Sequence, residues 1–417
     1  MDKKKVPVLL LTGYLGSGKT TLLNRILTNK KGIKFAVIVN DIGEVNIDAS
    51  LIAKGGVVSS NDDSLVALQN GCICCTLQND LMQQVSELMK QSFDYIVIEA
   101  SGICEPEPIA RTLCSMPLAA PDLTKHAEPR LDAIVSVVDA LRLQSEFESG
   151  SKLQGNKIEE DDIENLVIQQ IEFCNIILLN KKSEVSSQDL KQIREVLRAL
   201  QPKAEIIECD YCDVELDKLI NTHLFDYEKT VTSATWIQEI EKPLEEIEAE
   251  EHHHHENEHA HHHDHDHEDH SECDHEHGVC YCHHHHHHEG GETEEYGIST
   301  FVYYRRAPFD INKFDWFVGN KWPSSVIRTK GICYFSDQTD MSYLFEQAGV
   351  QKKLTEAGKW YATAPQEELQ ELMAREPGLM KDWDPVYGDR MQKIVFIGKN
   401  MDREEITRLL DSCTENQ

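Results

Sequence analysis

Hydrophobic and polar positions follow two alternating patterns over the first 225 residues. Short runs that are apolar at nearly every position and rich in valine and isoleucine occupy residues 6–12, 34–40, 94–100, 131–140, 174–180 and 204–209. Such runs suit strands that are buried on both faces, as in a parallel sheet covered by helices. Segments with helical spacing fall between them, at 20–30, 76–91 and 186–201. The alternation predicts an α/β domain with a mostly parallel sheet over residues 1–225.

The pattern changes after this domain. Residues 226–296 become acidic, then histidine-rich and finally glycine-rich, and they keep no hydrophobic period, so we expect a disordered linker there. Residues 297–417 return to ordered patterns, with strand-like ISTFVYYRR and KIVFIG and helix-like QEELQELMARE. This stretch predicts a second, smaller α+β domain.

Charge and histidine are concentrated in the linker. The chain carries a formal charge of −32, of which residues 241–295 supply −18, and 19 of the 21 histidines lie between His252 and His288. This acidity argues against nucleic acid as the main partner, and no apolar run reaches the ~20 residues of a membrane span. Thirteen irregularly spaced cysteines suit free thiols in a reducing cytosol, so we expect a cytoplasmic protein without a membrane partner.

A phosphate-binding loop follows the first predicted strand. Gly13, four further residues, Gly18, Lys19 and Thr20 have its spacing and open a helix. The glycines let backbone N–H groups converge on phosphate oxygens, while Lys19 reaches the β- and γ-phosphates and Thr20 ligates Mg²⁺. The candidate nucleotide-binding residues are Gly13, Gly16, Ser17, Gly18, Lys19, Thr20 and Thr21.

A second catalytic element follows the strand 94–100. Glu99 ends that strand and is expected to position Mg²⁺ and its water, and the amide of Gly102 is placed to sense the γ-phosphate. Together with Lys19 and Thr20, they form the predicted catalytic set. Asp139 also ends a strand, but its context favours a helix N-cap.

Base recognition falls on Asn180, the last residue of the predicted strand 174–180, and Lys181, which form the first half of an Asn-Lys-x-Asp motif. The aspartate of that motif accepts the two guanine N–H donors, and here Ser183 stands in its place. Glu184, one residue further on, is a candidate substitute. We favour GTP, with ATP or relaxed specificity as the alternative.

A cysteine cluster is the second chemical landmark. Cys72, Cys74 and Cys75 lie within four positions, and thiolates are soft ligands that suit Zn²⁺. Asp41 and Glu44 are candidate additional ligands, although either can serve Mg²⁺ or shape the loop. The alternative for the cysteines is packing or redox chemistry. The histidine-rich segment suits several weak, exchangeable divalent-ion sites, or solubility alone.

The motifs GYLGSGKTTLLN, NDIGEVNID and GCICCTL, an ESG-type loop and a histidine-rich insert together resemble the CobW-related metallochaperone GTPases. The ranges SSVIRTKGICYFS and DRMQKIVFIGKNMDREEITRLLDSC resemble that family's C-terminal domain. The resemblance implies a GTPase of the P-loop class with GTP and Mg²⁺ as cofactors. It also implies a transferable metal held by Cys72, Cys74 and Cys75, usually Zn²⁺, with Co²⁺ or Ni²⁺ possible.

The resulting hypothesis is a nucleotide-gated zinc carrier. GTP and Mg²⁺ order residues 41–48 and 72–75 around the metal, and hydrolysis releases it to a client metalloprotein docked partly on the C-terminal domain. A homodimer is possible. Two alternatives remain: a metal buffer that stores ions in its histidine-rich insert, and a cobalt or nickel insertion factor for one enzyme.

Overall fold

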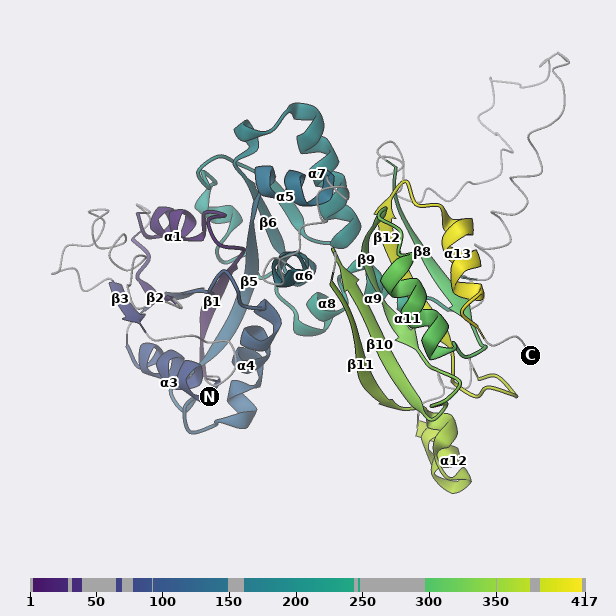
Figure 1. The fold of residues 1–417 in the computed structure, drawn as a ribbon. Coiled ribbons are helices and arrows are strands. Elements are labelled where there is room, and N and C mark those ends of the chain that lie inside the picture. The colour runs from purple at the N-terminus through teal and green to yellow at the C-terminus, as the bar shows by residue number, and fades with distance from the viewer. Residues whose placement is uncertain are drawn as a thin grey trace, which may run out of the picture.

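The computed structural model describes residues 3–28, 32–39, 65–69, 78–91, 93–148, 161–243, 247, 297–349, 351–375 and 383–414. These residues form two sheets, each with its own helices (Figure 1). The strands of the first sheet, in chain order, are β1 (Lys4–Thr12), β2 (Phe35–Val39), β3 (Leu65–Gln69), β4 (Tyr95–Glu99), β5 (Ala127–Asp139), β6 (Ile176–Asn180) and β7 (Glu205–Glu208). All neighbouring pairs are parallel, in the order β3-β2-β4-β1-β5-β6-β7.

The first sheet is buried on both faces. On β1, Val8 and Leu10 belong to one apolar core, and Leu9 and Leu11 belong to the core on the opposite face. The helices around the sheet are α1 (Lys19–Leu27), α3 (Gln78–Met89), α4 (Pro106–Ala119), α5 (Ala140–Glu148), α6 (Asp161–Glu172) and α7 (Ser187–Leu200). Continuous apolar runs in the sequence therefore correspond to strands with helices on both sides, as their composition predicted.

The beginning of the expected linker is helical. α8 (Tyr227–Val231) and α9 (Thr235–Glu241) lie within residues 226–243, and Asp226 caps α8 by accepting a hydrogen bond from the Lys229 N–H. The folded part therefore continues beyond α9, and Ile247 is buried in the core that the two domains share. Of the rest of the expected linker, the structure describes only residue 247. β3 was also not predicted from the sequence.

The second sheet is antiparallel, in the order β11-β10-β9-β12-β8. Its strands are β8 (Ile298–Arg305), β9 (Val326–Cys333), β10 (Met341–Ala348), β11 (Gln351–Lys359) and β12 (Gln392–Lys399), and its helices are α11 (Ile311–Asn320), α12 (Gln366–Arg375) and α13 (Arg403–Asp411). The α+β class expected for residues 297–417 is thus confirmed.

The two faces of the second sheet have different partners. Phe301 and Phe396 face an aromatic core closed by α11 and α13, while Val302 and Val395 belong to the same core as α6 and α7 of the first domain. Figure 1 shows α6, α7 and α9 between the two sheets. The domains therefore share one continuous apolar core.

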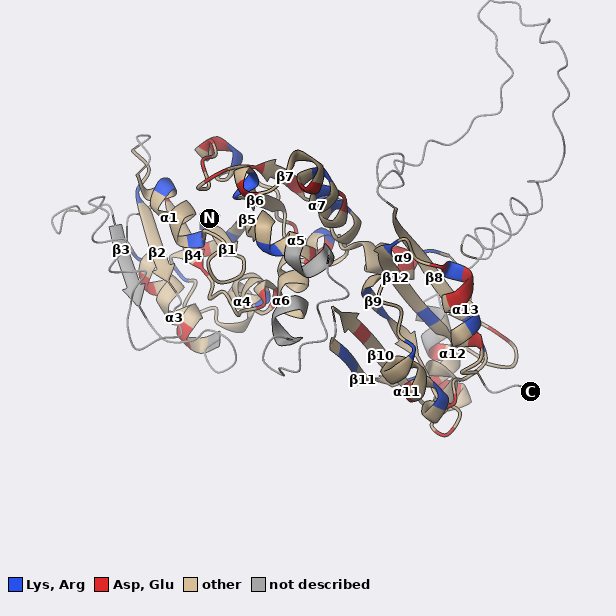
Figure 2. Ribbon diagram, turned by 45° about the horizontal axis from the view of Figure 1, so that its top comes forward, with Lys and Arg blue, Asp and Glu red and all other residues tan. Residues whose placement is uncertain are grey.

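Acidic and basic residues are interspersed along the described helices and strands (Figure 2). None of the helices in the described part of the chain is long and apolar enough to cross a membrane.

Candidate functional site

The phosphate loop joins β1 to α1 in a conformation that only glycine adopts easily. Gly13, Gly16 and Gly18 have φ values of 134°, 77° and 117°. A Cβ on Gly13 would lie 2.3 Å from the carbonyl oxygen of Val137 on β5, so the chain also needs a small residue for this close approach. These glycines therefore place the loop at the N-terminus of α1, where backbone N–H groups can donate hydrogen bonds to phosphate oxygens.

The catalytic side chains predicted from the sequence meet at this loop. Lys19 is 7% exposed, and its Nζ donates to the Tyr14 carbonyl oxygen at 3.2 Å. The Thr20 hydroxyl donates to Glu99 Oε1 at 2.9 Å, which joins the first turn of α1 to the end of β4. A hydroxyl and a carboxylate at this distance are hard oxygen donors of the kind that Mg²⁺ prefers.

Gly102 lies directly against the phosphate loop. A Cβ at this position would lie 2.7 Å from the backbone nitrogen of Leu15. Gln170 of α6 holds the Gly102 segment, because its Nε2 donates to the carbonyl oxygens of Gly102 at 3.2 Å and Cys104 at 3.1 Å. Sequence reasoning missed Gln170, since nothing in its local pattern separates it from other polar helix residues.

Asn180 ties the end of β6 to the phosphate loop. Its Nδ2 donates to the Ser17 carbonyl oxygen at 2.8 Å, and its Oδ1 accepts from the Cys212 N–H at 3.0 Å. Lys181 follows with a left-handed φ of 61° and forms an ion pair with Asp139. Asp139 Oδ1 also accepts from the Arg142 N–H at 3.3 Å, which confirms its role as the N-cap of α5.

Two buried cysteines, Cys209 and Cys212, lie behind the loop and were not predicted as part of the site. Cys212 Sγ donates to the Gly18 carbonyl oxygen at 3.4 Å. The hydrogen bond between the two thiols lowers the pKa of Cys209, and the same bond together with burial raises the pKa of Cys212. Their Cys-x-x-Cys spacing after the strand 204–209 was the available sequence signal.

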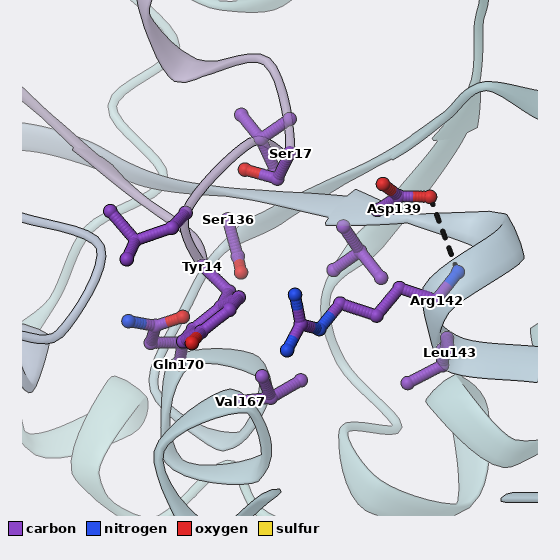
Figure 3. A pocket seen from close by; sticks show the side chains of 11 residues that line it. Tyr14, Ser17, Ser136, Asp139, Arg142, Leu143, Val167 and Gln170 are labelled. Carbon is purple, nitrogen blue, oxygen red and sulfur yellow. Dashed lines mark hydrogen bonds between the residues drawn. The ribbon is translucent and has the colours of Figure 1, made fainter. Parts of the chain in front are cut away.

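A small cavity of about 20 Å³ lies on the other side of the loop (Figure 3). At the edge of the cavity, the Arg142 guanidinium is stacked over the Tyr14 ring, 4.0 Å from the ring centre. Ser17 Oγ, Ser136 Oγ and Gln170 Oε1 are buried in this region and have no hydrogen-bond partner among the described groups. The cavity has room for about one water molecule. It is therefore too small to be the nucleotide pocket.

The predicted metal ligands fall on a different part of the chain. Asp41, Glu44, Cys72, Cys74 and Cys75 all lie outside the described residues. Among the residues that are described, no group of three or more histidine, cysteine, aspartate or glutamate side chains is arranged to hold a metal ion. The metal site remains a prediction from the sequence.

Comparison with known proteins gives the family. Residues 7–208 match the CobW/HypB/UreG nucleotide-binding domain, and residues 298–414 match the cobalamin synthesis protein cobW C-terminal domain. The chain belongs to the CobW family. Its first domain is thus a nucleotide-binding domain of the P-loop class, and its second is the CobW C-terminal domain.

Relatives of this CobW-family chain carry informative names. It is 32% identical to "Zinc-regulated GTPase metalloprotein activator 1" of Dictyostelium discoideum, over 98% of this chain and 80% of that protein. It is 29% identical to "Zinc chaperone CobW" of a Sinorhizobium species, over 50% of this chain and 60% of that protein. Among solved structures, it is similar to the Zn(II)-bound YjiA GTPase from E. coli, at 21% identity and a TM-score of 0.38 over the full length of both chains.

Proposed function

We propose that this CobW-family protein is a GTP-hydrolysing zinc metallochaperone, which binds zinc at a Cys-x-Cys-Cys site and transfers it to client metalloproteins under nucleotide control. The observation that carries the proposal is the contact of Thr20 with Glu99 beside the close approach of Gly102 to Leu15. This arrangement places the proposed magnesium-binding pair, Thr20 and Glu99, next to the Gly102 segment, which contacts the phosphate loop. The names of the relatives, a zinc-regulated GTPase activator and a zinc chaperone, support the choice of GTP and zinc.

Each residue of the nucleotide site has a distinct role in this proposal. The N–H groups of residues 13–18 and the Lys19 ammonium hold the phosphates, and Thr20 and Glu99 hold Mg²⁺ and orient its water. The Gly102 amide responds to the γ-phosphate. Bound Mg²⁺ neutralises the charge that develops on the phosphate oxygens.

The path from nucleotide to metal follows the sheet. β2 is parallel to β4 with Val39 opposite Glu99, so β2 ends next to the catalytic carboxylate, shortly before Asp41 and Glu44 in the sequence. The segment with Cys72, Cys74 and Cys75 ends where α3 begins at Gln78. Nucleotide-dependent ordering of these two segments closes the zinc site, and hydrolysis opens it. A tenfold change in affinity requires about 1.4 kcal/mol.

Transfer to a client metalloprotein is the outcome we propose for hydrolysis. In this proposal the client docks partly on the second domain, which shares one apolar core with the first domain, so a bound client is connected to the nucleotide site.

The test compares zinc affinity in the two nucleotide states by chelator competition. We expect the full chain to bind its tightest zinc ion at least tenfold more tightly with a non-hydrolysable GTP analogue than with GDP. Cys74→Ser is expected to remove this tight site and leave GDP affinity within about twofold, because the phosphate loop is untouched. Cys114→Ser, at an exposed free cysteine of α4, is the matched control.

Equal zinc affinities in the two states would contradict nucleotide gating. Loss of all tight binding on removal of residues 252–288, with Cys74→Ser silent, would identify the protein as a metal buffer. Tighter binding of Co²⁺ or Ni²⁺ than of Zn²⁺ at the Cys74-dependent site would identify it as a cobalt or nickel insertion factor.

A further inference from the structure

The proposed preference for GTP lacks its usual carboxylate. Ser183 stands where an Asn-Lys-x-Asp motif has an aspartate, and a hydroxyl cannot accept two hydrogen bonds from guanine in the way a carboxylate does. Adenine presents one donor and one acceptor on the corresponding edge, whereas guanine presents two adjacent donors. A site selective for guanine therefore needs a carboxylate from elsewhere in the fold.

Asp210 brings a carboxylate to Ser183. Its Oδ1 accepts from the Ser183 N–H at 3.0 Å and from the Ser183 hydroxyl at 2.9 Å. Both bonds go to the same oxygen, and no hydrogen bond to Oδ2 occurs among the described residues, so Oδ2 keeps its lone pairs for another donor. The hydrogen bond from the Ser183 N–H is the main factor that lowers the pKa of Asp210.

The loop that carries Asp210 belongs to the nucleotide site. β7 is parallel to β6, with Glu208 opposite Leu179, so residues 209–213 leave the sheet beside Asn180. The loop is attached to the phosphate loop through the Cys212 thiol, which donates to the Gly18 carbonyl oxygen. It is attached to α1 through Arg25, whose Nε donates to the Tyr211 carbonyl oxygen at 2.7 Å.

The backbone of this loop is held in an uncommon conformation. Tyr211 and Cys212 have φ values of 52° and 54°, in the left-handed region that non-glycine residues seldom occupy. Two such residues in succession fix the direction of the chain immediately after Asp210. The hydrogen bonds between this loop and Asn180, Gly18 and Arg25 therefore fix the position of the Asp210 side chain.

We propose that Asp210 is the guanine-selecting residue of this protein, with its carboxylate taking the part that the aspartate of an Asn-Lys-x-Asp motif plays elsewhere. Ser183 orients Asp210. The carboxylate that usually stands at position 183 is thus supplied by the loop after β7. The inference rests on the proposed function, because it assumes that the nucleotide is GTP.

Glu184 is the competing candidate. It lies in the short 3₁₀ turn Lys182–Glu184, where its N–H donates to the Lys181 carbonyl oxygen at 3.0 Å, and its side chain is exposed. It differs from Asp210 in having no hydrogen bond from Ser183 among those described. Glu184→Gln is therefore a matched control that removes the same charge one residue from Ser183.

The decisive variant is Asp210→Asn. The amide oxygen still accepts both bonds from Ser183, while the amide N–H₂ replaces the second acceptor with a donor. Xanthine carries a carbonyl where guanine has its amino group, so the variant should pair with xanthine instead. We expect GDP affinity to fall at least tenfold and xanthosine diphosphate affinity to rise at least tenfold, measured by titration of the full-length protein. Glu184→Gln should leave both affinities within about twofold.

The exchange variant S183D/D210S provides an independent test. It restores the usual motif and should regain the preference for GDP over ADP that Asp210→Ser alone should lose, and this comparison decides the matter if Asp210→Asn does not fold. Unchanged affinities in Asp210→Asn, or a switch to xanthine in Glu184→Gln, would overturn the role of Asp210 alone. A wild-type protein that binds GDP and ADP equally would overturn both this inference and the proposed GTPase function.

Discussion

Gly13 illustrates how closely the site depends on single residues. Its φ of 134° and the 2.3 Å approach that its Cβ would make to Val137 O are separate constraints, and both act on the loop that contacts phosphate. The absence of a side chain at Gly13 therefore allows the backbone conformation of the phosphate loop.

Gly13→Ala should destabilise the fold by about 1–3 kcal/mol, because the new methyl group forces either the loop or β5 to move. GDP affinity should fall at least tenfold in titration calorimetry, since the N–H groups lose their alignment. Gly319→Ala in α11 is the control, since its Cβ would meet nothing within 4 Å. It should stabilise the protein by up to about 1 kcal/mol in urea unfolding. Similar effects of the two substitutions would contradict this account.

Residues with short-range signatures could be predicted from the sequence. The phosphate loop and Glu99 have fixed positions relative to neighbouring strands, and the structure places Thr20 and Glu99 in contact. Asp210 and Gln170 had no comparable signature. Their partners, Ser183 and Gly102, are 27 and 68 residues away in the sequence, so only folding brings them together.

Among the secondary-structure elements, α11 shows how a helix start is encoded. Asp310 precedes the helix, and its Oδ1 accepts from the N–H groups of Asn312 and Lys313, both at 2.9 Å. The helix then directs Phe314 and Phe317 into the aromatic core on the outer face of the second sheet. The Asp310 cap thus determines where α11, which covers this face of the sheet, begins.

Asp310→Ala should lower the free energy of unfolding by about 1 kcal/mol, because two N–H groups at the helix start lose their acceptor. Asp310→Asn keeps an acceptor oxygen and should cost less than half as much. The measurement is the urea-unfolding midpoint of both variants. The cap assignment is wrong if alanine and asparagine are equally destabilising.

Long apolar strands were easier to predict than short elements. α8 and α9 have five and seven residues, too few for a strong helical period, and tertiary contacts stabilise them. In α9, the Trp236 ring lies 4.2 Å from Lys330 Nζ on β9. That contact joins segments almost a hundred residues apart, so the local sequence did not reveal it.

At the scale of the whole molecule, a buried ion pair joins the two domains. Arg328 of β9 is fully buried, and its Nε and Nη2 donate to the two carboxylate oxygens of Glu172 at 2.9 Å and 3.1 Å. Glu172 ends α6, the helix whose Gln170 holds the Gly102 segment. The C-terminal domain is therefore connected to the nucleotide site through one helix. The sequence predicted two domains but not this junction.

Glu172→Leu should destabilise the protein by about 3–5 kcal/mol, because it leaves the buried Arg328 guanidinium with Glu346, 3.7 Å away, as its remaining ion-pair partner among the described residues. Arg328→Met should have a similar effect. The double variant should lose much less than the sum of the two, since neither charge is left unpaired. Denaturant unfolding of the three proteins measures this coupling. Additive losses would show that the pair contributes no interaction energy.

The chain on either side of residues 244–296 is attached to the same strand. The Lys242 carbonyl oxygen accepts from Lys393 Nζ at 2.9 Å, near the beginning of β12, and the Gly297 carbonyl oxygen accepts from the Asn400 N–H at 2.7 Å, just beyond its end. Because the domains are joined by their own core and by the Glu172–Arg328 pair, the peptide connection contributes little to their arrangement. Insertions, deletions or a chain break in the histidine-rich stretch should therefore leave the two domains assembled in the same way.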